Sequence, residues 1–346
     1  MKPDSLRDNF PLDGQGETGH PEGPRRVFDR TESVQVDRPT GDKLAEVING
    51  IFVRRNQEAP VITNRQPQIF ESTFCSETLK CRFYDGTTTQ LLCKYGLAVA
   101  GHAHSSYGHR GGLAHEAAVY SQVLANVENT VATYYGFHAD PDGTEWLLLE
   151  FLENVWRANK SPDLLAMGAA ASWAGAFHAR APVKLGAIAG LMAYDRTFYN
   201  GWLERSLDIL DNPMPKWLEL LYQRREEVFT CLLRAPQSLF HGEFYPHNIL
   251  YREGTIYPVD WESAAVAPGE IDLAALMFEW PAPEANNMEW RYCATRWPGG
   301  TPRSFESTIA AAEVYVAFRN IADGPEDPTY MLHSLRIAGM RGGWIE

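Results

Sequence analysis

The sequence predicts an α+β fold in which a sheet-rich N-terminal part precedes a larger, mostly helical C-terminal part. Three observations support this prediction. Short apolar runs separated by turn residues gather before residue 153, with one helical segment among them. Helical spacing of apolar residues dominates after that point. A single later stretch, residues 239–261, returns to short apolar runs that end in polar side chains.

The composition limits the classes of function. The chain has 346 residues, of which 45% are hydrophobic and 22% charged, as in ordinary globular proteins. A net charge of −13 argues against a nucleic-acid partner. An acidic surface can attract a cationic substrate, although solubility alone also explains the charge. No apolar run approaches the roughly 20 residues of a membrane helix, and the N-terminus lacks a secretory signal. We therefore expect a cytoplasmic monomer or homodimer without membrane contacts.

The cysteines are read as reduced, structural thiols. Their number is odd and no pair has the spacing of a zinc knuckle or redox motif. They are Cys75, Cys81, Cys93, Cys231 and Cys293.

The order of elements divides the chain into three parts. Residues 1–40 are rich in Gly, Pro and charged residues and predict a disordered or loosely docked tail. Residues 41–153 form the N-terminal lobe. It is expected to hold a helix near residues 42–52 and strands near 60–71, 78–84, 88–95, 131–137 and 145–151, with a helix over 111–124. Asp85-Gly86 marks a hairpin between the second and third strands.

The C-terminal lobe, residues 154–346, is expected to be mainly helical. Helical segments are predicted over 163–179, 198–210 and 215–234, and over most of 271–346. The strand-and-loop stretch between them carries the chemistry.

Polar side chains end two apolar runs in this stretch, at His241 and at Asp260. Phosphoryl transfer from a nucleotide requires Mg²⁺, which prefers oxygen ligands. Asn248 and Asp260 are suitable ligands, and Glu243 can accept a hydrogen bond from an attacking hydroxyl. Taken singly, each of these residues is as well explained by a turn or a strand end. Their combination favours a phosphotransferase.

The motif His241-Gly-Glu243-x-x-x-x-Asn248 followed by Asp260-Trp-Glu resembles the catalytic and metal-binding loops of the aminoglycoside phosphotransferase and choline kinase superfamily. Its spacing is also similar to that of protein-kinase loops. Two further stretches resemble the superfamily: Pro268-Gly-Glu-Ile-Asp272-Leu-Ala, and Ala171-Ser-Trp-Ala-Gly-Ala-Phe-His178. The resemblance spans roughly residues 66–280. It implies a bilobal protein-kinase-like fold with an antiparallel five-stranded N-terminal sheet.

The resemblance also implies roles for the matching residues. Glu243 would orient or deprotonate the acceptor hydroxyl, and Asn248 and Asp260 would bind Mg²⁺. His241 would support the loop through hydrogen bonds. Lys94, in an otherwise apolar strand, would contact the phosphates of ATP or GTP with Glu116 as its partner. Glu150, Phe151 and Leu152 would form the hinge that binds the purine.

Two departures from the superfamily pattern stand out. The loop between the first two strands has no glycine, so Ser72, Thr73 and Ser76 would have to keep the phosphate-binding turn tight. The catalytic carboxylate is Glu243 where the superfamily usually has aspartate. Because phosphoryl transfer depends mainly on positioning and charge, activity is expected to be retained with altered geometry.

The expected function is transfer of a γ-phosphate to a hydroxyl of an aminoglycoside or another sugar- or nucleoside-type antibiotic, giving resistance or self-protection. The alternatives are a metabolic kinase for choline, an amino sugar or homoserine, and a nucleotide-binding regulator with little activity. Candidate liners of the acceptor pocket are aromatic residues in 194–202 and 280–290, Phe244 and Tyr245. Glu279, Glu284 and Glu289 could bind amines. Residue by residue, core packing is the more ordinary explanation for the aromatic side chains, and a solvated helix surface is the more ordinary explanation for the acids.

Overall fold

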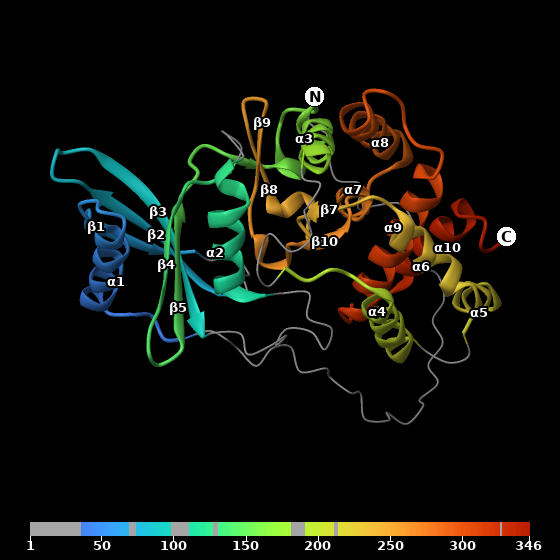
Figure 1. Ribbon diagram of the computed structural model, residues 1–346, viewed down its shortest axis with the longest axis horizontal. Coiled ribbons are helices and arrows are strands. Elements are labelled where there is room, and N and C mark those ends of the chain that lie inside the picture. The colour runs from blue at the N-terminus through green and yellow to red at the C-terminus, as the bar shows by residue number, and fades with distance from the viewer. Residues whose placement is uncertain are drawn as a thin grey trace, which may run out of the picture. The chain divides into compact units, whose positions relative to one another are not determined.

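The computed structural model describes residues 36–68, 74–97, 111–126, 131–180, 191–210, 214–325 and 327–346 (Figure 1). All of these residues belong to one compact unit, Thr31–Glu346. The tail expected at residues 1–40 lies outside the described residues up to residue 35. In the described part of the chain, no helix has both the length and the apolar character needed to cross a bilayer.

The N-terminal part is built on a five-stranded sheet with the order β1-β2-β3-β5-β4. Every neighbouring pair is antiparallel, which confirms the prediction. The hairpin between β2 and β3 turns at Asp85 and Gly86, where Gly86 has φ 87°. The strands are β1 (Val61–Pro67), β2 (Cys75–Arg82), β3 (Thr88–Leu97), β4 (Tyr134–Ala139) and β5 (Thr144–Glu150).

Strand β2 begins at Cys75, three residues earlier than predicted, and β1 ends at Pro67, before the predicted residue 71. The polar pair Ser76 and Glu77 indicated a loop in the sequence. In the structure Glu77 is buried and accepts hydrogen bonds from Arg65 and Arg38. These two guanidinium groups and the hydroxyl of Tyr95 lower the pKa of Glu77 to about 2, although burial alone would raise it. The compensated charge lets the strand continue.

Each face of the sheet is covered by one helix (Figure 1). Helix α1 (Gly41–Arg54) buries its apolar stripe on one face, as the spacing predicted. Helix α2 (Gly112–Gln122) covers the other face and is followed by the 3₁₀ turn η1 (Leu124–Asn126). Because side chains alternate along β3, Leu91, Cys93 and Tyr95 enter the core under α1. Lys94 therefore lies on the face that carries α2.

The C-terminal part is mostly helical. The segment predicted as one helix over 215–234 is two helices, because Arg224 leaves the helical region with φ −94° and ψ 9°. The helices are α3 (Ala166–Arg180), α4 (Arg196–Ile209), α5 (Lys216–Gln223), α6 (Arg225–Arg234), α7 (Glu270–Met277), α8 (Ala282–Arg296), α9 (Phe305–Ala322) and α10 (Thr329–Arg341).

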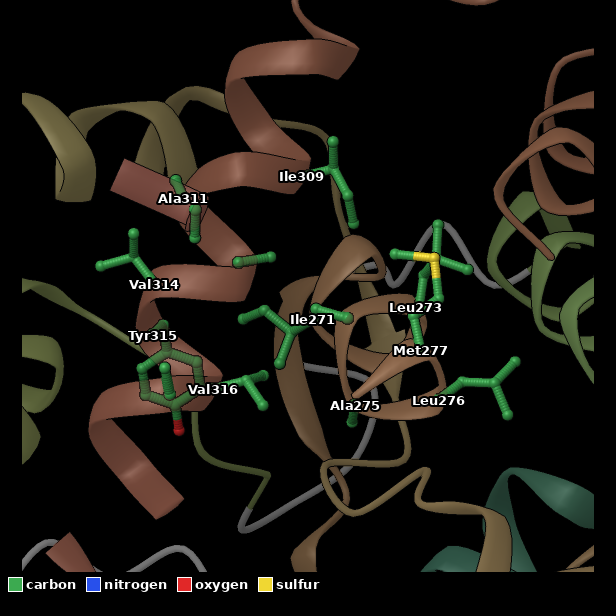
Figure 2. Close-up of a cluster of buried hydrophobic side chains, with 14 of the residues drawn as sticks. Ile271, Leu273, Ala275, Leu276, Met277, Ile309, Ala311, Val314, Tyr315 and Val316 are labelled. Atoms are coloured by element: carbon green, nitrogen blue, oxygen red, sulfur yellow. The ribbon is translucent and has the colours of Figure 1, made fainter. Parts of the chain in front are cut away.

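Helices α7 and α9 form the centre of this part. Figure 2 shows their apolar side chains in one cluster, with Ile271 and Leu273 from α7 near Ile309 and Val316 from α9. Every residue of α7 and most residues of α9 are buried, so both helices are held within the core. This matters for function because each helix carries a polar side chain that reaches residues 241–243.

Two small sheets shape the stretch that carries the motifs. Strand β7 pairs with β10, and β8 pairs with β6 and β9. Their bounds are β6 (Trp156–Arg157), β7 (Gln237–Phe240), β8 (Ile249–Arg252), β9 (Thr255–Pro258) and β10 (Ala265–Pro268). Short 3₁₀ turns lie between them and after β6: η2 (Ala158–Lys160), η3 (Pro246–Asn248) and η4 (Trp261–Ser263). His241 follows β7, and Asp260 follows β9.

Candidate active site

A cavity of about 500 Å³ lies between the sheet part and the motif stretch. Lys94 and Glu116 line it from the sheet part, and Asn248 and Asp260 line it from the motif stretch. Among its other lining residues are Ser76, Glu150, Phe151, Leu152 and His247. The structure thus brings together residues that are far apart in the sequence. Ser72 and Thr73 lie outside the described residues.

Lys94 is the centre of a buried charge cluster in this cavity. Its Nζ donates to both carboxylate oxygens of Glu116, at 3.0 and 2.9 Å, and to Oδ1 of Asp260 at 2.8 Å. Burial opposes a charged lysine, but Asp260 and Glu116 outweigh this effect and hold the pKa of Lys94 well above its ordinary value. Lys94 is therefore a fixed cation at one wall of the cavity.

Asp260 is placed by an unusual backbone conformation. Its φ is 69° and its ψ is 63°, in the left-handed region that non-glycine residues rarely adopt. The next residue, Trp261, is fully buried, and its backbone N–H lies 3.4 Å from Oε1 of Glu116. The chain therefore turns sharply after β9 and presents the Asp260 carboxylate, which is 31% exposed, to the cavity.

The loop after β7 is held by a second buried network. Asp272 of α7 accepts the backbone N–H of His241 at 2.7 Å and that of Gly242 at 3.0 Å. It also accepts from Nε2 of His178 at 3.1 Å. Gly242 has φ 86°, and a Cβ there would lie 2.2 Å from the carbonyl oxygen of Ser263. Only glycine fits at this position, and α7 fixes its orientation.

His241 does not line this cavity and supports the loop instead. It is buried, and burial lowers the pKa of its imidazole. Nδ1 accepts the backbone N–H of Glu243 at 3.2 Å, so Nε2 carries the proton and donates to the carbonyl of Val259 at 3.0 Å. The neutral ring thus connects the loop to the end of β9.

Asn248 and Asp260 offer an amide oxygen and a carboxylate to the same cavity. Nδ2 of Asn248 donates to the carbonyl of Glu243 at 3.1 Å, so Oδ1 is the atom that can bind a metal. This donor set suits Mg²⁺. Among the described residues, no group of three or more His, Cys, Asp or Glu side chains is placed to hold a metal ion. A Mg²⁺ ion here would take its remaining ligands from phosphate and water.

Glu243 lies in a different, second cavity of about 590 Å³. Oε1 of this residue accepts from Nη2 of Arg319 at 2.5 Å, and both side chains are almost fully buried. Nη1 of the same arginine donates to the carbonyl of Gly242. Sequence reasoning missed Arg319. A charge within the apolar run of α9 was its only signal, and Glu313 in the same run gives the same signal.

The second cavity is polar and rich in carboxylates. Besides Glu243, Arg319 and His247, its lining includes Asn159, Tyr245, Pro246, Phe278, Glu279, Trp280, Asn320, Asp323 and Met331. Three residues that the sequence suggested for the acceptor pocket lie in this wall, namely Glu279, Trp280 and Tyr245. The aromatic residues of 194–202 instead form core, since Tyr194, Phe198, Tyr199 and Trp202 are buried together. Phe244 is also core, and Glu289 pairs with Arg341.

His247 lines both cavities. Its ring stacks on that of Tyr245, with centroids 5.6 Å apart and planes 6° from parallel. The first cavity and the second therefore adjoin at the loop that carries Glu243 and Asn248.

A sheet lobe with a strand lysine paired to a helix glutamate, joined to a helical lobe with this loop, defines a kinase-like phosphotransferase. The chain belongs to the phosphotransferase enzyme family (APH), whose model matches residues 102–303. It is therefore a small-molecule phosphotransferase that uses an alcohol as acceptor. No curated protein shows significant sequence similarity to the chain.

Solved structures share the fold at low sequence identity. Choline kinase LicA from Streptococcus pneumoniae is 13% identical over 87% of this chain and 98% of its own, with a TM-score of 0.53. The GDP complex of aminoglycoside 2'-phosphotransferase-IIIa is 13% identical over 88% and 99%, with a TM-score of 0.55. Macrolide 2'-phosphotransferase MphH from Brachybacterium faecium is 16% identical over 85% and 97%, with a TM-score of 0.51. These similarities confirm the predicted fold.

Proposed function

We propose that the enzyme transfers the γ-phosphoryl group of ATP or GTP, with Mg²⁺, to a hydroxyl of a small molecule that also carries an amine. An aminoglycoside or another sugar- or nucleoside-type antibiotic is the leading candidate. The observation that carries this proposal is the pair of adjoining cavities. One holds the lysine and the metal-type ligands, and the other holds Glu243 among further carboxylates.

The first cavity suits the nucleotide. Lys94 would bind phosphate oxygens, and Asn248 and Asp260 would hold Mg²⁺, which neutralises charge on the phosphates. At the hinge, the backbone N–H groups of Glu150 and Phe151 already donate to Thr133 and Gln90. The Glu150 side chain likewise accepts from Thr133. The purine edge would therefore meet the backbone from Leu152 onward.

Glu243 is the residue that we assign to the acceptor hydroxyl. A carboxylate at this position can accept the hydroxyl hydrogen bond, orient the oxygen toward the phosphoryl group and take up its proton. The backbone on either side is fixed, because Asp272 holds Gly242 and Asn248 holds the carbonyl of Glu243. Such positioning provides much of the rate in phosphoryl transfer.

The second cavity favours a cationic acceptor. Glu279 and Asp323 place two carboxylates in its wall, beside the aromatic rings of Trp280 and Tyr245. Aromatic faces and carboxylates together bind ammonium groups. Glu279 has φ 69°, a strained backbone conformation for a glutamate and a feature found often at functional sites.

A metabolic kinase for choline, an amino sugar or homoserine is the second candidate. The wall that combines Trp280 with Glu279 also suits a small ammonium alcohol. Choline kinase LicA and a microcompartment-associated aminopropanol kinase share the fold with this chain, the latter at 12% identity and a TM-score of 0.54. A regulator with little activity is disfavoured by the intact set of Lys94, Glu116, Asn248 and Asp260.

The test is a panel of acceptors with Mg·ATP and Mg·GTP. It should include aminoglycosides, macrolides, choline, amino propanol and homoserine, and neutral sugars that lack the amine. We expect phosphorylation of an amine-bearing acceptor. Glu279→Gln and Asp323→Asn should raise its KM about tenfold each, while the nucleotide KM stays unchanged. Equal activity on neutral and amine-bearing acceptors, or unchanged KM in both variants, would contradict the proposed acceptor class.

A further inference from the structure

Arg319 is the residue on which the geometry of Glu243 depends most directly. Its guanidinium holds the Glu243 carboxylate through Nη2 and the Gly242 carbonyl through Nη1. The side chain is 3% exposed and that of Glu243 is 8% exposed. Burial opposes its charge, but Tyr245 and Glu243 outweigh this and hold the pKa of Arg319 well above its ordinary value. Arg319 is therefore a fixed cation beside the Glu243 carboxylate.

The guanidinium acts as a rigid fork. Its donors lie in one plane, so two bonds to adjacent residues fix a carboxylate more tightly than a single point charge can. The neighbouring residue of α9 adds a third contact, since Oδ1 of Asn320 accepts the Tyr245 hydroxyl at 2.8 Å. The last turn of α9 thus holds three residues of the loop, namely Gly242, Glu243 and Tyr245.

Helix α9 is a firm support for this fork. Its apolar side chains pack with those of α7 in the buried cluster that Figure 2 shows. Helix α7 holds the same loop through Asp272, which accepts the backbone N–H groups of His241 and Gly242. Two helices of one core therefore fix opposite polar groups of residues 241–243.

The length of Glu243 matches this arrangement. An aspartate would be shorter by one carbon–carbon bond, about 1.5 Å at most. Because Gly242 anchors the guanidinium, Arg319 could not follow a shorter side chain without losing its bond to the backbone. We propose that Arg319 is the positioning residue of the transfer site and that it adapts the site to glutamate in place of aspartate. The proposal rests on the role of Glu243 in the proposed function.

The test is a set of variants at both positions. They are Arg319→Met, Arg319→Lys, Glu243→Asp and the double variant Glu243→Asp with Arg319→Met. Turnover is measured as release of ADP or GDP from the Mg·nucleotide, with water alone and with the acceptor found in the panel. Nucleotide Kd and Tm are measured for every variant. Arg341→Met is the matched control, because Arg341 pairs with Glu313 of α9 but lines neither cavity.

We expect Arg319→Met and Glu243→Asp each to lower kcat about a hundredfold, since an error of about an ångström has that effect. The kcat of the double variant should fall no further than the kcat of the more severely impaired single variant. Arg319→Lys should recover part of the loss, because an ammonium can replace one prong of the fork. Nucleotide Kd should stay within about twofold, since Arg319 does not line the first cavity. Arg341→Met should keep its kcat.

Several results would overturn the proposal. Wild-type kcat in a folded Arg319→Met or Arg319→Lys enzyme would exclude a positioning role. If the loss of kcat in the double variant equals the product of the two single losses, the residues act independently. A joint fall of kcat, nucleotide affinity and Tm would indicate that the pair has a purely structural role. Faster nucleotide hydrolysis in the variants than in the wild type would indicate that the pair restrains turnover. If Arg319→Met does not fold, the kcat values of Glu243→Asp and Arg319→Lys test the proposal instead.

The proposal and the proposed acceptor class fail in different ways. If no amine-bearing acceptor is phosphorylated, the acceptor class is wrong, while hydrolysis with water still reports on Arg319. Full turnover in Glu243→Gln would instead remove the role of Glu243 itself.

Discussion

At the scale of single residues, the site depends on buried charges that are compensated by named partners. Lys94 has two such partners, Glu116 on α2 and Asp260 after β9. Breaking a buried ion pair from one side leaves an uncompensated charge and is strongly destabilising. We therefore expect the same lysine to contribute to stability as well as to the proposed chemistry, and the two contributions can be separated.

Lys94→Met should lower turnover by at least about a hundredfold, because a preorganised cation is lost from the phosphate site. It should also destabilise the fold by about 3–5 kcal/mol, because Glu116 stays buried without its lysine. Adding Glu116→Gln should recover much of the stability but none of the turnover. Urea unfolding and nucleotide turnover measure the two effects. Lys80→Met, at an exposed position on β2, is the control. A double variant that regains turnover would contradict the role of Lys94.

The residues of the site differ in how far the sequence could reveal them. Lys94, Asn248 and Asp260 were predictable, because each breaks an apolar run or matches a motif of fixed spacing. Arg319 was not, because no local pattern links positions 319 and 243. Only the packing of α9 brings the two together. Likewise, a buried aromatic residue and a pocket aromatic residue look the same in a sequence, so Trp202 and Trp280 could not be told apart.

At the scale of elements, the strands and helices followed from periodicity, and their limits depended on charge pairing. The early start of β2 depends on two arginines that neutralise Glu77. A similar cluster joins three helices of the C-terminal part. Arg341 of α10 pairs with Glu289 of α8 and with Glu306 and Glu313 of α9.

Glu313 should make this helix cluster sensitive to pH. Burial raises the pKa of Glu313 to about 7, against the opposing effect of Arg341. A raised pKa means that the folded state binds more protons than the unfolded state between about pH 4.5 and 7. The contribution of Glu313 to stability is therefore present at low pH and is lost as pH rises through about 7.

The wild-type protein should thus lose about 1–3 kcal/mol relative to Glu313→Gln between pH 5 and 8. Urea unfolding of both proteins at the two pH values measures this difference, and the other titrating groups cancel in the comparison. Parallel stability curves would show that Glu313 titrates normally.

At the scale of the whole described unit, the first cavity connects the sheet part to the helical part. Lys94 and Glu116 belong to the first of these, and Asn248 and Asp260 to the second. A ligand that contacts all four residues binds the folded chain only, so it must stabilise the entire unit against unfolding.

Mg·ATP or Mg·GTP at about one hundred times its Kd should add about 2.7 kcal/mol to the free energy of unfolding. The corresponding rise in Tm is roughly 5–10 °C, since about 1 kcal/mol shifts Tm by roughly 2–4 °C in domains of moderate size. Part of the shift should disappear with EDTA, because Asn248 and Asp260 would bind the nucleotide through the metal. Asp260→Asn should lack that metal-dependent part, whereas Asp323→Asn, in the second cavity, should keep it. An equal shift with and without Mg²⁺ in the wild-type protein would place the metal elsewhere and leave Asp260 as a partner of Lys94 alone.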